Sequence, residues 1–279
     1  MFIMKLNNNT EMPQIGLGTY MLTPNEAYQS VSEALKIGYR LIDTANAYVN
    51  EKAVGRAIKD SGVAREEIFL STKIWASEYL NDNAVDETIA RLGVDYIDLL
   101  FLHQPCKDYL YAYKNLEKAY KDGKIKAIGI SNFEGEYIKD LLAHCEIVPQ
   151  VMQVEAHPYF PQDELRVLLN KHDIKLMSWY PLGHGDKTLL EEPIFKKLGE
   201  KYGKTPAQVC LRWHVDMGFI VIPGSKNQKH IADNFDISDF ALTQEEMTEI
   251  AKLNKEKRYY HRTQSQLDAF SAWRPNYEK

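Results

Sequence analysis

The sequence of 279 residues is poor in cysteine. Its three cysteines, Cys106, Cys145 and Cys210, are odd in number and far apart. This excludes both a disulfide framework and a Cys-x-x-Cys metal site built from them. Scarce, unpaired cysteine is typical of proteins in a reducing compartment, so we expect a cytoplasmic protein.

Long apolar runs are also missing. No segment approaches the roughly 20 apolar residues that a membrane helix requires, and residues 1–13 lack the apolar core of a signal peptide. Charge of one sign is not in large excess, since 34 Lys and Arg stand against 39 Asp and Glu, a net charge of −5. This mild acidity argues against a nucleic-acid or anionic-membrane partner, although it leaves room for a local basic pocket.

Three common catalytic fingerprints do not occur. The sequence contains no Gly-x-Gly-x-x-Gly, no Gly-x-Ser-x-Gly and no His-Glu-x-x-His. The usual signatures of Rossmann dinucleotide-binding proteins, serine hydrolases and zinc proteases are therefore absent. The eight histidines do not fall at metal-ligand spacing either, so we predict no metal site.

Short apolar segments, by contrast, recur at nearly even intervals. The first seven begin 24 to 29 residues apart, and the eighth begins 44 residues after the seventh. Each gap has room for one helix, and the last has room for additional structure. The segments, which we predict to be strands, are residues 15–18, 40–43, 68–73, 97–103, 125–131, 151–155, 175–180 and 219–223.

The gaps contain signals for helices. Thr23-Pro24-Asn25-Glu26 forms a capping box with proline at the first helical position, Gly38 is suited to end that helix, and Thr205-Pro206-Ala207-Gln208 repeats the pattern. Alternating strands and helices with no low-complexity linker predict an α/β protein, a single (β/α)8 barrel domain over residues 1–279. A doubly wound open sheet is the alternative.

Chemically useful residues end several of the apolar segments. Asp43, Lys73 and His103 end three successive ones. In a barrel the carboxyl ends of all strands open on one rim, where barrel enzymes place their active sites. Charged groups next to a core need partners, so we expect these three to share a pocket. The alternative is that polar residues only mark strand ends and that Asp43 and Lys73 form a structural ion pair.

A motif near the N-terminus closely resembles that of the aldo-keto reductase family. It consists of residues 38–45, which read Gly-Tyr-Arg-Leu-Ile-Asp-Thr-Ala, followed by Tyr48, Asn50-Glu51 and Gly55. The resemblance covers almost the whole chain. It implies a TIM barrel with a short N-terminal hairpin and extra C-terminal helices, an NAD(P)H cofactor and reversible carbonyl reduction. Further motifs follow in the family's order: Ser71-Thr72-Lys73, Asp98-Leu99-Leu100 leading to His103, Gly129-Ile130-Ser131-Asn132-Phe133, Gln153-Val154-Glu155, Pro181-Leu182-Gly183, and Ile222-Pro223 with Ser225.

The resemblance also implies four catalytic roles. Tyr48 is the proton donor, but a phenol with a pKa near 10 needs a stabilised anion to act well. Lys73 lowers the pKa of Tyr48 through its charge, and Asp43 pairs with Lys73. His103 hydrogen-bonds and orients the substrate oxygen.

A cofactor site follows from the same resemblance. Ser131, Asn132 and Gln153 hold the nicotinamide carboxamide, and Trp179 lies flat on the ring. Residues 224–234 follow the eighth strand, where barrels bind phosphate through backbone N–H groups and a helix dipole. The full set of expected cofactor residues is Gly18, Thr19, Asp43, Ser131, Asn132, Gln153, Trp179, Leu182, Ser225, Lys226, His230 and Asn234.

The sequence departs from the family at the phosphate end. Gly224 stands where many relatives have a lysine, and His230 stands where they have an arginine that grips the 2′-phosphate of the adenosine. Lys226, Lys229 and His230 compensate in part, but they lack the bidentate fork of arginine. We expect NADPH to be preferred over NADH less exclusively than in relatives that have both cations.

Tyr20, Met21 and Trp75 should line the substrate mouth with His103, and Phe270 and Trp273 should fold over it unless the tail packs on a barrel helix. This favours a small-molecule aldehyde, ketone or dicarbonyl substrate and a monomeric enzyme. Two alternatives are a non-catalytic NADP-binding regulatory subunit with the same fold and a lyase in which Lys73 forms a Schiff base.

Overall fold

The structure, a computed structural model, describes residues 2–277, and its main sheet contains eight parallel strands in chain order. Every predicted strand corresponds to one of them. The strands are β3 (Leu17–Gly18), β4 (Leu41–Asp43), β5 (Phe69–Ile74), β6 (Leu99–Leu102), β7 (Ile128–Ser131), β8 (Val151–Glu155), β9 (Lys175–Trp179) and β10 (Ile220–Val221).

The two outer strands of this sheet meet and close it. Parallel bridges join Ile15 to Val221 and Gly18 to Gly224. The Gly16 N–H donates to the Val221 carbonyl over 2.9 Å, and the Val221 N–H donates to the Gln14 carbonyl over 2.8 Å. The predicted barrel is therefore confirmed, and the open-sheet alternative is wrong.

Several strands are shorter than predicted, among them the two predicted at 97–103 and 125–131. Only an isolated bridge between Ile97 and Ile125 precedes β6 and β7. Asp98 accounts for part of the difference, since its carboxylate accepts hydrogen bonds from the Leu70 N–H at 3.0 Å and from the Arg65 guanidinium at 2.7 Å. The Asp98 side chain thus accepts from the Leu70 N–H at the point where the regular hydrogen bonds between β5 and β6 begin.

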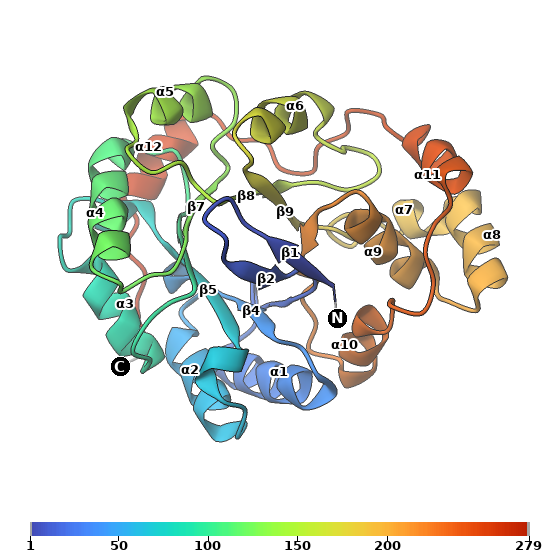
Figure 1. Cartoon of the computed structure of the whole chain (residues 1–279), viewed down its shortest axis with the longest axis horizontal. Helices are drawn as coiled ribbons and strands as arrows, with labels where there is room; N and C mark the ends of the chain where they lie inside the picture. The colour runs from blue at the N-terminus through green and yellow to red at the C-terminus, as the bar shows by residue number, and fades with distance from the viewer. Residues whose placement is uncertain (1, 278–279) are drawn as a thin grey trace.

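Helices surround the barrel (Figure 1). Thr23 and Thr205 cap their helices as predicted, each with a complete capping box, and Gly38 ends the first helix at φ 123°. Among residues 2–277 no helix combines the length and apolarity needed to cross a membrane. The helices around the barrel are α1 (Pro24–Ile37), α2 (Glu51–Asp60), α3 (Ala84–Leu92), α4 (Tyr109–Lys121), α5 (Glu136–His144), α6 (Asp163–Lys171), α9 (Pro206–Asp216) and α10 (Gln228–Phe235).

Further helices lie outside this regular alternation. The long gap before β10 holds α7 (Lys187–Glu191) and α8 (Pro193–Tyr202), while α11 (Gln244–Ala251) and α12 (Gln264–Ala272) follow the barrel. Short 3-10 turns precede or follow strands at η1 (Asn46–Tyr48), η2 (Arg65–Glu67) and η3 (Ala76–Glu78). The extra C-terminal helices expected from the resemblance are therefore present.

A hairpin closes one end of the barrel. Strands β1 (Ile3–Lys5) and β2 (Glu11–Pro13) pair antiparallel and lie across the centre of the view in Figure 1. Leu6 and Met12 are buried with apolar side chains from the starts of the strands, including Leu41, Leu99 and Val151. The amino end of the barrel is thus filled, which leaves the carboxyl end for a site.

Candidate active site

A cavity of about 660 Å³ opens at the carboxyl ends of the strands. Its walls combine polar strand-end residues with aromatic side chains from the loops and the tail. The predicted site residues that line it are Gly18, Tyr20, Met21, Asp43, Tyr48, Trp75, His103, Ser131, Asn132, Gln153, Trp179, Leu182, Gly224, Ser225, Lys226, Phe270 and Trp273.

Four predicted site residues do not line the cavity. Lys73 is fully buried behind Asp43, and the Thr19 hydroxyl donates to the Asp43 carbonyl over 3.1 Å. Asn234 is buried in α10, whereas His230 is exposed near the start of that helix. Thr19 and Lys73 therefore lie behind the cavity wall.

Several lining residues were not assigned to the site from the sequence, although Tyr180 ends a predicted strand and Pro181, Ile222 and Pro223 belong to the family motifs. Tyr180 and His184 come from the loop after β9, where both have positive φ angles, 53° and 52°, and their rings stack 3.8 Å apart. Tyr260 comes from the C-terminal tail, which has no strong local pattern. The other missed lining residues are Leu22, Ala47, Gln104, Pro181, Gly185, Ile222 and Pro223.

A buried ion pair forms the base of the site. The Lys73 ammonium lies 2.6 Å from the Asp43 carboxylate and also donates to the Thr44 carbonyl over 2.7 Å. The second Asp43 oxygen accepts from the Ser71 hydroxyl at 2.8 Å and from the Gln153 amide at 3.2 Å. Burial lowers the pKa of Lys73, and the nearby Asp43 opposes this. The charges are compensated by each other and by hydrogen bonds, as a low-dielectric site requires.

Tyr48 lies beside this pair, on η1 just after β4. The Lys73 ammonium is 5.1 Å from the centre of its ring. Burial, with a further contribution from the negative charge of Asp43, raises the pKa of Tyr48 well above its ordinary value. The phenol therefore holds its proton, as a proton donor must.

This direction is opposite to the expected lowering of the Tyr48 pKa by Lys73. The main physical reason is burial, which removes the phenol from water and disfavours its anion. The negative charge of Asp43 acts in the same direction, and Asp43 also balances the Lys73 charge at 2.6 Å.

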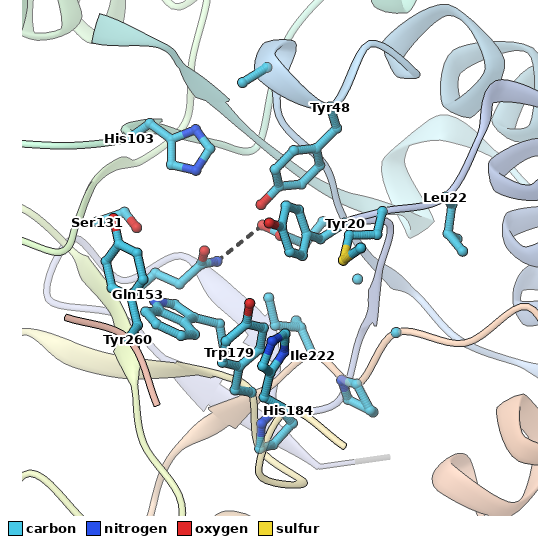
Figure 2. A pocket seen from close by; sticks show the side chains of 18 of the residues that line it. Tyr20, Leu22, Tyr48, His103, Ser131, Gln153, Trp179, His184, Ile222 and Tyr260 are labelled. Atoms are coloured by element: carbon cyan, nitrogen blue, oxygen red, sulfur yellow. Dashed lines mark hydrogen bonds between the residues drawn. The ribbon is translucent and has the colours of Figure 1, made fainter. Parts of the chain in front are cut away.

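His103 faces Tyr48 from the end of β6. Figure 2 shows the Tyr48 hydroxyl and the His103 ring facing the same space, with Gln153 and Trp179 on its other side. The rings of His103 and Tyr48 are 5.7 Å apart, and Trp75 stands edge-on to His103 at 5.0 Å. Burial and then the charge of Lys73 lower the pKa of His103 well below its ordinary value, so the ring is neutral.

The His103 ring also retains hydrogen-bonding capacity. Its Nδ1 is buried without a hydrogen-bond partner among the described residues. A neutral imidazole has one donor and one acceptor nitrogen. Because Nδ1 is buried, a hydrogen bond from His103 to a polar group in the cavity would come from its other nitrogen, Nε2.

A network of amides forms the opposite wall. The Asn132 amide nitrogen donates to the Ser131 hydroxyl at 3.1 Å and to the His103 carbonyl at 3.3 Å. The Asn132 amide oxygen accepts from the Trp179 indole at 3.2 Å, which fixes that ring. A flat aromatic surface beside hydroxyl and amide groups suits the stacking and hydrogen bonding of a nicotinamide.

At the end of the cavity where the resemblance places the cofactor phosphates, the two lysines are paired with carboxylates. Lys226 lines the cavity, but its ammonium pairs with Glu26 at 2.9 Å, and Lys229 pairs with Asp233. A side chain at Gly224 would place its Cβ 2.9 Å from the Gly18 carbonyl oxygen. A side chain at this position would therefore require the backbone to move.

No group of three or more His, Cys, Asp or Glu side chains that could hold a metal ion occurs within residues 2–277. The chemistry of the described cavity is therefore that of a phenol, an imidazole, amides and a buried ion pair.

A family model identifies the family of the chain. Residues 14–255 match the model of the Aldo/keto reductase family. The chain belongs to the aldo/keto reductase family. It is thus an oxidoreductase, and the family expected from the motifs is confirmed.

Relatives in this family include named reductases of small dicarbonyls. Glyoxal reductase of Bacillus subtilis is 46% identical over 259 residues, covering 91% of this chain and 93% of that protein. Methylglyoxal reductase DkgA of Escherichia coli is 40% identical over 260 residues, covering 92% and 94%. These relatives support carbonyl reduction as the reaction class.

Solved aldo-keto reductase structures have the same fold. The aldo-keto reductase of Brucella melitensis is 42% identical with a TM-score of 0.87, covering 91% of this chain and 99% of that one. The Bombyx mori aldo-keto reductase, solved in complex with NADP, is 32% identical with a TM-score of 0.87, covering 93% and 95%.

The neutral state of His103 generates a prediction. Because its pKa is lowered, the ring should stay neutral as the pH falls through 6.5, the ordinary histidine value. In NMR spectra the His103 ring resonances, assigned by their absence from His103→Gln, should not titrate between about pH 5 and 8. A titration midpoint near pH 6.5 would contradict this electrostatic account.

Proposed function

We propose that this enzyme uses NADPH to reduce small aldehydes, ketones and dicarbonyls to alcohols, with Tyr48 as the proton donor. One observation carries the proposal. A protonated phenol and a neutral imidazole face the same space beside the Trp179 ring, with the Asp43 and Lys73 pair behind them. The names of the glyoxal and methylglyoxal reductases favour α-dicarbonyls among the possible substrates.

The bound cofactor would supply the hydride. Ser131, Asn132 and Gln153 would hold its carboxamide, and Trp179 would cover one face of its ring. Leu182, Ser225 and the start of α10 would contact the rest of the dinucleotide.

The chain's own residues then manage the proton. As the carbonyl carbon is reduced, its oxygen gains negative charge and takes the proton from the Tyr48 hydroxyl. A hydrogen bond from His103 orients that oxygen and stabilises the developing charge. When Tyr48 has given up its proton, the Lys73 ammonium stabilises the resulting phenolate. Before the reaction the charge of Lys73 is balanced by Asp43.

The lining of the cavity favours uncharged substrates. Its charged members among the described residues are Asp43 and Lys226, and each is paired with an opposite charge. Tyr20, Trp75 and Trp273 contribute aromatic surface at the substrate end. A neutral carbonyl compound suits these walls better than an anionic keto acid does.

The two alternatives are less well supported. A Schiff base on Lys73 requires an accessible amine, but Lys73 is 0% exposed and hydrogen-bonded to Asp43 and Thr44. A non-catalytic regulatory subunit disagrees with the reductase names of the relatives. The single-domain organisation, the monomeric state and the cytoplasmic location stay predictions.

Replacing Tyr48 with Phe tests the proposed proton donor. We expect kcat for carbonyl reduction to fall by about 10²-fold to 10⁴-fold, because only the acid is removed, while NADPH affinity stays nearly unchanged. NADPH oxidation and fluorescence titration of cofactor binding measure the two quantities. Tyr111→Phe on α4, outside the cavity, is the control, and strong residual reduction by Tyr48→Phe would reject the mechanism.

Replacing Glu26 with Gln tests the cofactor preference. The change frees Lys226 for the 2′-phosphate, while glutamine still suits the capping box with Thr23. Since exposed ion pairs are weak, we expect NADPH to bind about 2-fold to 5-fold more tightly and NADH binding to be unchanged. Glu33→Gln on the same helix is the control. Equal changes for both cofactors would show that Lys226 does not read the phosphate.

A further inference from the structure

The C-terminal tail, residues 256–277, forms part of the cavity wall. The family match ends at residue 255, so the tail lies outside the matched region. It nevertheless contributes Tyr260, Phe270 and Trp273 to the lining. The Trp75 indole holds the middle of the tail by donating to the Phe270 carbonyl over 2.9 Å. What fixes the start of the tail therefore matters for the shape of the site.

A buried carboxylate provides that fixation. Glu155 ends β8, is 1% exposed and does not line the cavity. One of its oxygens accepts from the Tyr259 N–H at 2.6 Å, and the other accepts from the Tyr260 N–H at 3.0 Å. His157 Nε2 lies 3.0 Å from the first oxygen. Hydrogen bonds to a carboxylate from two consecutive backbone donors are short and strong.

These bonds reach the reacting region through Tyr260. Its ring stands nearly edge-on to Trp179 at 5.6 Å, with an interplanar angle of 77°. Figure 2 places Tyr260 between Ser131 and Trp179, on the side of the space opposite Tyr20. Tyr260 is thus part of the cavity wall, and a shift of its backbone would move this wall. We expect only substrates larger than the dicarbonyl unit to contact it.

Other contacts of the tail are less suited to fixing Tyr260. Lys255 and Lys257 pair with Glu192 and Asp186, but their side chains are 50% and 44% exposed, so these ion pairs are weakened by solvent. Arg262 donates to the Asn132 carbonyl and holds the chain two residues further on. Arg258 pairs with Glu134, and the Tyr259 hydroxyl donates to Asp186 over 2.7 Å, but these contacts hold side chains next to Tyr260. The contact with Glu155 holds the Tyr260 backbone.

We infer that Glu155 is a positioning residue. By holding the backbone of Tyr259 and Tyr260 against β8, it sets the width of the cavity at its substrate end. The inference rests on the proposed carbonyl reduction and deepens it, because it assigns discrimination between small and bulky dicarbonyls to a residue outside the cavity. We expect a compact dicarbonyl bound between Tyr48, His103 and Trp179 to make little contact with Tyr260, which lies beside Trp179. An aryl dicarbonyl should extend to that wall.

Kinetics of Glu155→Gln test the inference. The amide keeps the shape of the side chain but turns an NH₂ group toward one of the two backbone donors. We expect the KM for phenylglyoxal to rise about 10-fold, the size of a lost charge-assisted hydrogen bond. The kcat and KM for methylglyoxal and the Kd for NADP+, measured by fluorescence quenching, should change by less than about 2-fold.

Two further variants separate positioning from general damage. Glu192→Gln removes the partner of Lys255 at the start of the tail and should leave both substrates unaffected. In a Tyr260→Ala background, Glu155→Gln should have little further effect on phenylglyoxal, since it acts through Tyr260. Equal losses with both substrates, or an undiminished effect without the Tyr260 ring, would overturn the inference. Glu155→Asp keeps the charge, so its KM for phenylglyoxal should lie between those of the wild type and Glu155→Gln. This variant replaces Glu155→Gln in the test if the latter does not fold.

Hydrogen exchange gives a readout that does not depend on turnover. The amides of Tyr259 and Tyr260 should be protected in the wild type and should exchange at least about 10-fold faster in Glu155→Gln. Unchanged protection would overturn the anchor. Faster exchange in a protein whose wild type reduces no carbonyl would keep the anchor but reject its role in substrate selection and the proposed function.

Discussion

The ion pair between Asp43 and Lys73 is the interaction on which the site depends. A charged pair with almost no solvent contact is tolerated only because every charge has a partner, and those partners come from adjacent and from distant strands of the barrel. Ser71 and Lys73 lie on β5, next to β4, while Gln153 reaches the same carboxylate from β8. Satisfying this pair therefore requires the closed barrel. Removing one member would leave an uncompensated charge in the core, a change far more severe than the loss of a surface ion pair.

The charge states of Tyr48 and His103 depend on this pair and on burial. Burial and the Asp43 charge keep Tyr48 protonated, while burial and the Lys73 charge keep His103 neutral. Two uncharged hydrogen-bonding groups then face a space walled by aromatic rings. A second buried carboxylate, Glu155, lies outside the cavity and holds the tail instead. One acidic residue thus supports the reacting groups, and another shapes the access to them.

Much of this architecture could be predicted from the sequence because its signals are local. All eight strands could be predicted from short apolar runs, and the helices between them from capping boxes and from a glycine at a helix end. The motifs of the family indicated Asp43, Tyr48, Lys73 and His103 as site residues. Contacts between distant segments were not predictable in this way. Nothing near Tyr260 indicates that it packs beside Trp179, and nothing near Lys226 indicates that Glu26 holds it. The direction of the Tyr48 pKa was missed because burial and the balance between two neighbouring charges are properties of the folded site.

The most direct measurement follows the hydrogen that reaches the carbonyl carbon. The reduction of methylglyoxal is run with NADPH deuterated at C4 on one face and, separately, on the other, and the product is analysed by mass spectrometry. Because Trp179 should cover one face of the ring, the account predicts deuterium on the alcohol carbon from only one of the two labelled cofactors. Deuterium from neither, or from both equally, would contradict hydride transfer in this site.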